Sequence, residues 1–418
     1  MTDWVVGATS APPKRRYAKL GLARNPFSAA GLAPEQPSGL PASKIRAQLE
    51  GFVSSFLQTG SYQAAVLIGP YGSGKTHHMR LLENLFRKDQ ATRVVYLASA
   101  QNEPRQVVQA VLQELGRGDL AKLIWRPILA RILTMQQADP AQVRTEFGDE
   151  RTTKGRLPQG SVGMFPDEVF PEAAFVDYRR FIQAFQKRRD LSLRRLRTYA
   201  ISALAKHLGI AASAAALLFA TTEDESLRSA GAADLLFSSP TTDRANEAEV
   251  LGGLSKLLAE DGTTRLVILI DEFEGVSMLE RMTRKQSVEY LYALRMLVDK
   301  TAPTATYALV LATTPQAFDL ARKQYAAVES RFTTLIRLPV IDQSTAREIL
   351  TGILDTARLS SSPGGIHPFT DGFLEALLAT GVSVPRTLVV RAHRAIELAA
   401  SDSKAKEIGA EMVPGLTD

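Results

Sequence analysis

The stretch that decides the fold is Gly69-Pro70-Tyr71-Gly72-Ser73-Gly74-Lys75-Thr76, which directly follows the apolar run Ala64–Ile68. It fits the pattern Gly-x-x-x-x-Gly-Lys-Ser/Thr, between a short buried strand and the helix-forming stretch His77–Arg87. Glycines let backbone N–H groups turn inward around a polyphosphate, and the start of the next helix adds partial positive charge. Lys75 can reach the β- and γ-phosphates, and the Thr76 hydroxyl can bind Mg²⁺. The stretch therefore predicts a phosphate-binding loop.

The composition is that of a globular protein without thiol chemistry. The chain has 418 residues, of which 45% are hydrophobic, enough for two or three domains with cores of their own. It has no cysteine, which excludes disulfides, thiolate metal sites and thiol nucleophiles, and its net charge of +6 indicates little about partners. The five histidines show no metal-ligand spacing. There is no signal pattern and no apolar run of the ~20 residues that span a bilayer, so we expect a cytoplasmic protein without membrane contact.

A second apolar run, Leu266–Ile270, ends in the two carboxylates Asp271 and Glu272. A run without alternation fits a strand buried on both faces of a parallel sheet. Acids at the C-terminal end of such a strand lie where open α/β sheets bind ligands. We expect Asp271 to hold Mg²⁺ through water and Glu272 to polarise an attacking water as general base. The alternative is an acidic cap on the next helix.

A third run, Tyr307–Ala312, is followed by Thr313 and Thr314. Either hydroxyl could contact a γ-phosphate or orient the attacking water, and either could instead cap a helix that starts at Pro315. Further strands are predicted at 93–98 and 335–338. Because strands alternate with helical stretches, the sequence predicts an α/β fold with a mostly parallel sheet.

The order of these motifs resembles that of the AAA+ ATPases, in particular the origin initiators and transposition regulators. In that family the loop at 69–76 would be Walker A. The end of the second run would be Walker B, and the end of the third run would be sensor 1. The resemblance implies a parallel-sheet P-loop core that binds ATP and Mg²⁺. It also implies an arginine finger just before the fifth strand, where Arg331 lies, with Arg322 as the alternative. Such an arginine stabilises charge on the phosphoryl group in a neighbouring subunit.

The C-terminal part resembles the helical lid of the same family. Amphipathic stretches cover 344–357 and 371–380, and a third helix opens with Gly381-Val382-Ser383-Val384-Pro385-Arg386. This opening resembles sensor 2 of initiator-type members, which implies that Arg386 contacts the γ-phosphate across the lid; a surface arginine is the alternative. Near the N-terminus, Arg24-Asn25-Pro26-Phe27 resembles the segment that covers adenine in related ATPases. Phe27 is therefore a candidate adenine contact, or else a buried anchor of a loop.

The resemblance divides the chain into five parts. We expect a basic flexible segment at 1–25, the first part of the AAA+ core at 26–118, a mostly helical basic insertion at 119–242, the second part of the core at 243–340 and a helical lid at 341–418. Many initiators continue into a winged-helix DNA-binding domain, which we do not expect here. Any DNA contact is then expected from the core or the insertion.

The insertion has the sharpest charge feature of the sequence. Eight bases fall within nineteen residues, and Asp190 is the only acid among them: Arg179, Arg180, Lys187, Arg188, Arg189, Arg194, Arg195 and Arg197. This density suits phosphate contacts, which give affinity for nucleic acid without sequence choice. A site for an acidic protein partner and a solvated face of a helical bundle are the alternatives.

The motifs and the resemblance together predict a Mg²⁺-dependent ATP hydrolase. The resemblance implies nucleotide-dependent homo-oligomers that act as a DNA-associated switch or loader for partner proteins, of the type found in initiation, transposition or mobile-element defence. Double-stranded DNA and a partner protein would be its ligands. The alternative is a protein-remodelling or signalling ATPase whose insertion binds a protein rather than DNA. A nucleotide-binding module that does not hydrolyse ATP is a further alternative.

Overall fold

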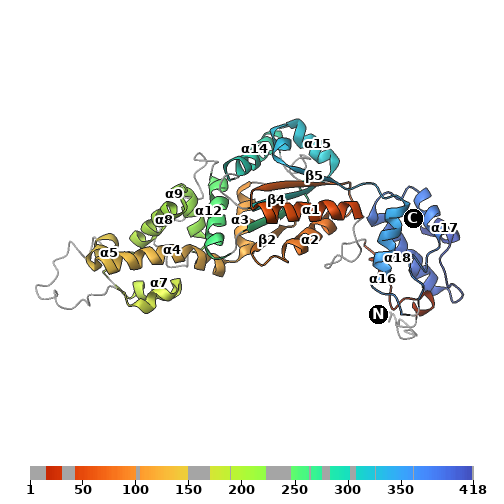
Figure 1. Cartoon of the computed structure of the whole chain (residues 1–418), viewed down its shortest axis with the longest axis horizontal. Helices are drawn as coiled ribbons and strands as arrows, with labels where there is room; N and C mark the ends of the chain where they lie inside the picture. The colour runs from red at the N-terminus through yellow and green to blue at the C-terminus, as the bar shows by residue number, and fades with distance from the viewer. Residues whose placement is uncertain are drawn as a thin grey trace, which may run out of the picture.

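The computed structural model describes residues 16–30, 43–99, 104–148, 170–188, 190–222, 246–262, 265–274, 283–301, 307–324, 326–360 and 362–416. In Figure 1 they form an elongated molecule with an α/β core in the middle. A helical insertion lies at one end of this core and a helical lid at the other.

The core is built on one parallel sheet. Its strands are β1 (Gln63–Ile68), β2 (Thr92–Leu97), β3 (Arg265–Ile270), β4 (Tyr307–Thr313) and β5 (Thr334–Arg337). Their order is β2-β3-β4-β1-β5, and every pair is parallel, which confirms the predicted α/β class. Since β4 lies between β1 and β3, the carboxyl ends of all three meet at the same edge of the sheet. The sheet thereby places the ends of β1, β3 and β4, which the predicted motifs follow, at one edge.

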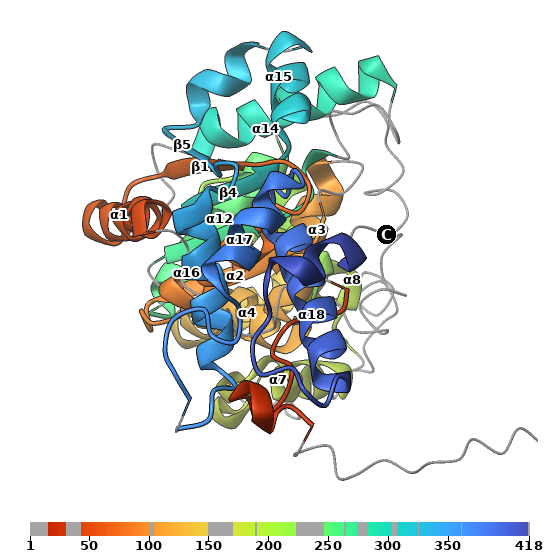
Figure 2. The same cartoon turned by 90° about the vertical axis from the view of Figure 1, so that its right-hand side faces the viewer.

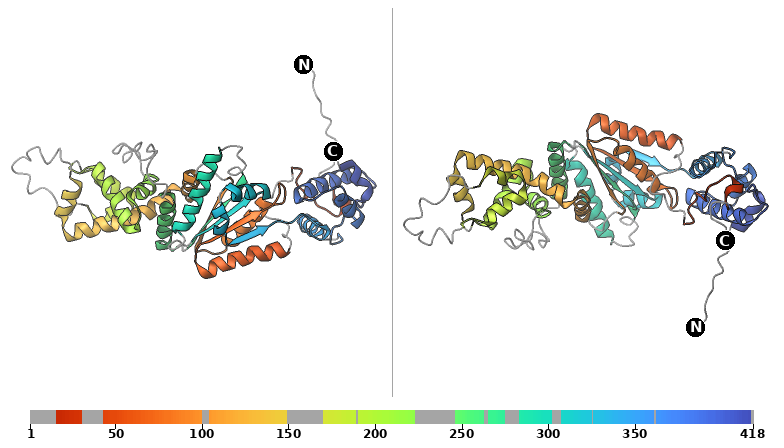
Figure 3. Two further views of the ribbon diagram at one scale, coloured as in Figure 1. Left: turned by 90° about the horizontal axis from the view of Figure 1, so that it is seen from above. Right: turned by 90° about the horizontal axis from the view of Figure 1, so that it is seen from below.

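Helices cover both faces of this sheet, as Figure 3 shows from above and below. On one face pack α1 (Ser43–Thr59) and α2 (Lys75–Phe86). On the other pack α3 (Pro104–Leu115), α12 (Asn246–Glu260), α14 (Arg284–Thr301) and α15 (Pro315–Gln324). The strands are apolar on both sides, and in β3 alternate residues enter two different cores. This burial explains why the strand sequences are continuous apolar runs.

The insertion is a helical bundle with an aromatic core. It comprises α4 (Arg117–Ala138), α5 (Pro140–Phe147), the 3-10 helix η4 (Glu172–Val176), α7 (Tyr178–Gln186), α8 (Leu193–Leu208) and α9 (Ala212–Ala220). The stretch at 175–207, which has helical spacing, thus holds the helices α7 and α8 with a break between them. Among its described residues, six aromatic side chains are fully buried: Trp125, Phe147, Phe170, Phe181, Phe185 and Phe219.

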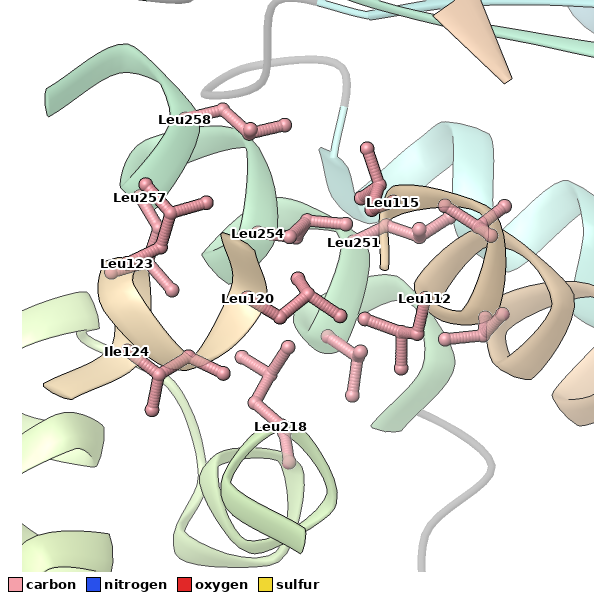
Figure 4. Close-up of a cluster of buried hydrophobic side chains, with 14 of the residues drawn as sticks. Leu112, Leu115, Leu120, Leu123, Ile124, Leu218, Leu251, Leu254, Leu257 and Leu258 are labelled. Atoms are coloured by element: carbon pink, nitrogen blue, oxygen red, sulfur yellow. The ribbon is translucent and has the colours of Figure 1, made fainter. Parts of the chain in front are cut away.

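The insertion joins the core through a cluster of aliphatic side chains, which we call the leucine junction (Figure 4). Helices α3, α4, α9 and α12 all contribute to it. Its labelled members are Leu112, Leu115, Leu120, Leu123, Ile124, Leu218, Leu251, Leu254, Leu257 and Leu258, all buried. They belong to one continuous hydrophobic cluster that also contains one face of the sheet. The insertion and the core therefore share a single core.

The lid has a hydrophobic core of its own, formed by α16 (Gln343–Asp355), α17 (Asp371–Ala379), α18 (Pro385–Ser401) and the 3-10 helix η6 (Ala410–Leu416). Within the N-terminal segment, the described residues 16–30 pack against this lid (Figure 2). Leu20 and Leu22 are fully buried there, and the Tyr17 hydroxyl donates to Glu397 Oε1 at 2.7 Å. Two buried leucines and this hydrogen bond hold the segment in place.

Candidate functional site

The phosphate-binding loop connects β1 to α2 with the backbone that the motif requires. Gly72 and Gly74 have φ of 79° and 89°, in the left-handed region that favours glycine. A Cβ at Gly69 would lie only 2.3 Å from Ser73 Oγ. The Gly69 N–H donates to the carbonyl of Thr313 at 3.1 Å, which ties the loop to the end of β4. The three glycines are thus needed for this loop shape.

Lys75, the first residue of α2, lies over its own loop and is almost fully buried. Its Nζ donates to the Gly69 carbonyl at 3.1 Å and is 3.7 Å from Glu274 Oε1. The neighbouring Thr76 is exposed. The ring of Tyr71, which is 64% exposed, has its centroid 5.1 Å from Nζ. The ammonium group therefore lies where the loop carbonyls, a carboxylate and an aromatic face meet.

His78 holds the junction between loop and helix, a role that the sequence did not reveal. Its Nδ1 is 2.8 Å from the carbonyl of Gly74, and the side chain is buried. Burial lowers the pKa of His78 to about 4, so the imidazole is neutral at physiological pH. Because a carbonyl only accepts, Nδ1 carries the proton and donates it to Gly74. The only sequence signal was a histidine one helical turn after Gly74.

Asp271, which follows β3, is buried and oriented by its neighbours. Its Oδ2 accepts a hydrogen bond from the Tyr96 hydroxyl at 2.9 Å, and its Oδ1 accepts one from the Glu272 N–H at 2.9 Å. Tyr96 lies near the end of the adjacent strand β2, and the guanidinium carbon of Arg80 is 3.6 Å from the centre of its ring. Burial, with the nearby Asp271 carboxylate, raises the pKa of Tyr96, which keeps the hydroxyl a donor. Sequence reasoning missed Tyr96.

The two glutamates after Asp271 lie in different surroundings. Glu272 is exposed and has φ of 49°, which is unusual for a residue with a side chain. Glu274 is buried, faces Lys75 and has its pKa raised by that burial. Its Oε2 has no hydrogen-bond partner among the described residues. The structure thus brings to Lys75 a carboxylate that the sequence analysis did not select, while the role of Glu272 stays a prediction.

The two threonines at the end of β4 are distinguished by their hydrogen bonds. Thr314 Oγ1 accepts from the Ala317 N–H at 3.3 Å and so caps α15, which begins at Pro315. Thr313 Oγ1 is buried and has no partner in the part of the chain that the structure describes. Thr313 also lies opposite Ile68, the last residue before the loop. Of the two hydroxyls, that of Thr313 is the one left for a ligand.

The lid reaches the phosphate-binding loop through the first turn of α18. The Arg386 N–H donates to the Gly72 carbonyl at 3.0 Å. A Cβ on Gly72 would lie 2.9 Å from Arg386 Cβ and 3.3 Å from Val384 Cγ2. Arg386, predicted from the lid resemblance, therefore lies beside the loop.

The other predicted residues lie away from this loop. Arg331 ends the 3-10 helix η5 (Ala326–Arg331), and Arg322 is 3.5 Å from Asp319 and 3.6 Å from Glu329. Phe27 is buried in the lid core, with its ring centroid 5.9 Å from that of Phe369. Its carbonyl accepts from His393 Nδ1 at 2.9 Å. Neither the finger role of Arg331 nor the adenine role of Phe27 is tested by these contacts.

The predicted nucleic-acid candidates are spread over the insertion. Arg179, Arg180 and Lys187 are exposed on or just after α7, and Arg188 is held by Asp190 at 2.8 Å. Arg194, Arg195 and Arg197 lie in the first turns of α8. Arg189 lies outside the described residues.

Neither a metal-ion cluster nor a single membrane-spanning helix is present among the described residues. No group of three or more histidines or acids is placed to hold a metal ion. No single helix is long and apolar enough to cross a membrane, although α8 and α9, bent by 116°, pass that test as a pair by length and composition.

No protein-family model and no curated protein matches this chain. Among solved structures it is similar to the Aeropyrum pernix ORC2 protein with ADPNP and ADP, at 11% identity and a TM-score of 0.46, over 91% of this chain and 68% of that one. The ORC1 protein of Aeropyrum pernix in complex with DNA has 14% identity and a TM-score of 0.42, over 93% and 67%. Cdc6p from Pyrobaculum aerophilum has 13% identity and a TM-score of 0.38, over 87% and 63%. Similarity at these values carries no assignment of function.

Proposed function

We propose that this chain is a Mg²⁺-dependent ATP hydrolase of the AAA+ type. One observation carries the proposal: four segments far apart in sequence converge at one edge of the sheet. These are the loop at 69–76, Asp271 after β3, Thr313 at the end of β4 and Arg386 at the start of α18. Each supplies a group that a nucleoside triphosphate and its metal require, namely N–H donors and an ammonium, a carboxylate, a hydroxyl and a guanidinium.

The residues present fit ATP and Mg²⁺. Left-handed glycines turn the loop so that its N–H groups can face phosphates at the start of α2. The hydroxyls of Ser73 and Thr313 are buried without a hydrogen-bond partner in the described residues, as suits side chains that meet a polar ligand. Thr76 and Asp271 offer the oxygen ligands that Mg²⁺ prefers, and phosphates supply others. Two protein ligands are enough for a metal that arrives with its nucleotide.

The proposed chemistry assigns a role to each side chain. Lys75 neutralises the β- and γ-phosphates, and Glu272 polarises the attacking water. Bound Mg²⁺ would withdraw charge from the transferred phosphoryl group. Thr313 orients the γ-phosphate or the water, and Arg386 couples the γ-phosphate to the lid through α18.

The identity of the general base is tested with two isosteric variants, Glu272→Gln and Glu274→Gln. We expect Glu272→Gln to slow hydrolysis by about 10²–10⁴-fold while ATP binding is retained, since a positioned base contributes that much. Single-turnover hydrolysis and nucleotide titration are the measurements. If only Glu274→Gln blocks hydrolysis, the base is Glu274. If neither variant slows it, neither carboxylate is the base.

We propose further that the active site is completed by Arg331 of a neighbouring subunit. The place of Arg331 just before β5 supports this. The test mixes two inactive variants, Arg331→Ala and Lys75→Ala. Each keeps the half of the shared site that the other lacks, so we expect mixing to restore hydrolysis. Arg331→Ala should also still bind ATP. A mixture as inactive as its components would contradict the intersubunit arrangement.

For the biological role we propose a DNA-associated switch or loader for partner proteins, in which ATP favours assembly. The basic residues in the first turns of α8 support contact with DNA. The test is the ATPase rate per subunit against protein concentration, with and without double-stranded DNA, at low and moderate salt. A rate that rises with concentration and again with DNA is expected. A rate indifferent to both would favour the alternative, an ATPase whose insertion binds a protein.

A further inference from the structure

A broad groove runs along one side of the insertion, between α4, α5 and α8. Its volume is about 1460 Å³. Both long helices line it with residues at the same spacing, i, i+1, i+4, i+5 and i+8, beginning at Ala130 on α4 and at Arg194 on α8. Residues with this spacing share one face of a helix. The groove is therefore formed by two regular helix faces and is closed at one side by α5.

The lining of this groove is basic and rich in hydroxyl groups. Arg131, Arg194 and Arg195 supply positive charge, and Glu146 is the only acid among the described lining residues. The hydroxyl-bearing residues are Thr134, Thr145, Ser192, Thr198, Tyr199 and Ser202. Burial raises the pKa of Tyr199, and the nearby guanidinium of Arg131 opposes this shift. The hydroxyls of Thr134, Thr145 and Thr198 donate to carbonyls of their own helices at 2.9, 3.0 and 3.1 Å. The guanidinium groups, together with the hydroxyls of Ser192, Tyr199 and Ser202, favour an anionic ligand with many oxygen acceptors.

The start of α8 adds to the positive field. The first turn of this helix has no acidic residue, and its N-cap Ser192 makes no side-chain capping bond. Arg194 and Arg195 lie in the same turn, although positive charge near a helix N-terminus is unfavourable. Arg195 of α8 donates to the Thr145 carbonyl of α5 at 3.2 Å. An anion bound here would offset the repulsion between these arginines and the helix dipole.

We propose that this groove binds the phosphodiester backbone of DNA, which rests on the DNA-associated role proposed above. Contacts to DNA phosphate come from arginines, from serine, threonine, glutamine and tyrosine side chains, and from helix N-termini. The groove presents every one of these groups, with Gln142 included. It also exceeds the ~300–1,000 Å³ of a site for a small ligand, and such sites are mostly apolar. An extended, charged polymer fits both its size and its chemistry.

The test compares two variants that lose the same charge. Arg131→Gln with Arg194→Gln removes two groove arginines, whereas Arg179→Gln with Arg180→Gln removes two exposed arginines on α7. Fluorescence anisotropy of a short labelled duplex, and of one of its strands, is measured over a range of salt. For the groove variant we expect affinity to fall on the order of tenfold near ~0.1 M salt and the salt slope to shrink by about two. The α7 variant should keep the wild-type slope.

Each outcome decides a different question. If wild-type protein binds DNA and both variants weaken it equally, or neither does, the groove is not the site while the DNA-associated role stands. If wild-type protein binds neither form of DNA, the DNA-associated role fails. The relative affinity of duplex and single strand shows which form supplies the backbone. A second variant, Thr198→Glu, places a negative charge at an exposed groove position and should weaken binding without disturbing the fold.

Discussion

At the scale of single residues, the hydroxyl of Tyr96 is the contact that orients Asp271 from a neighbouring strand. Partners of this kind typically change metal affinity or activity by about 10–100-fold when removed. We therefore expect Tyr96→Phe to raise the Mg²⁺ concentration needed for half-maximal ATPase rate by about tenfold. The control is Tyr290→Phe, because the buried hydroxyl of Tyr290 has no hydrogen-bond partner in the described residues. An unchanged Mg²⁺ dependence in Tyr96→Phe would remove Tyr96 from the site.

The two threonines at the end of β4 give a second prediction at this scale. Thr314→Val removes the cap of α15 and should cost about 1 kcal/mol of stability. Thr313→Val removes a hydroxyl that makes no hydrogen bond with the described residues. The free energy of unfolding should therefore stay unchanged while the rate of ATP hydrolysis falls. Thermal melts and single-turnover rates of both variants measure the two effects. If the two variants exchanged their effects, Thr314 would be the sensor.

How far single residues can be predicted depends on whether their role is local in sequence. Lys75, Thr76 and Asp271 were identified because a motif and an adjoining strand specify them. His78, Tyr96 and Glu274 were not, since each acts through a contact that only the folded loop, the strand order or the buried face after β3 creates. Thr313 and Thr314 could not be told apart until the capping bond was known.

At the scale of elements, the contact between the loop and α18 makes Gly72 sensitive to any side chain. An alanine there would combine a φ of 79° with a Cβ 2.9 Å from that of Arg386. We expect Gly72→Ala to separate the lid from the loop and to weaken both ATP binding and hydrolysis. Gly364→Ala is the control, because an added Cβ meets nothing within 4 Å there. Isothermal titration with ATP measures the first effect; equal affinity in both variants would contradict it.

The positions of helices and strands were predicted well where their apolar residues follow a single period. Each strand and each lid helix lies within a few residues of its predicted range, because apolar runs and amphipathic spacing reflect burial directly. The break between α7 and α8 was not predicted. It depends on the pairing of Leu191 with Gly148 and on the Ser192 N–H, which donates to the Phe147 carbonyl at 2.7 Å. These partners are distant in sequence and leave no local pattern.

At the scale of the whole molecule, the leucine junction joins the insertion and the α/β core in one hydrophobic cluster, so we expect the two to unfold as one cooperative unit. Leu254→Ala would leave a cavity in this junction, and we expect it to lower the free energy of unfolding by about 2–5 kcal/mol. Hydrogen exchange should then rise in both the insertion helices and α3. Leu377→Ala, in the separate lid core, is the matched control and should raise exchange chiefly in the lid. Exchange confined to the insertion in Leu254→Ala would show that the two parts unfold independently.

The same junction limits how this protein can be redesigned. Helices α3 and α12 would lose the partners of Leu115, Leu251 and Leu254 if the insertion were cut out, leaving a contiguous apolar face on the shortened chain. Such a truncated chain should aggregate rather than fold as an independent α/β core. An engineer who wants to exchange the insertion for another module must keep the first turns of α4 and the leucines of α12, and graft the new module beyond them.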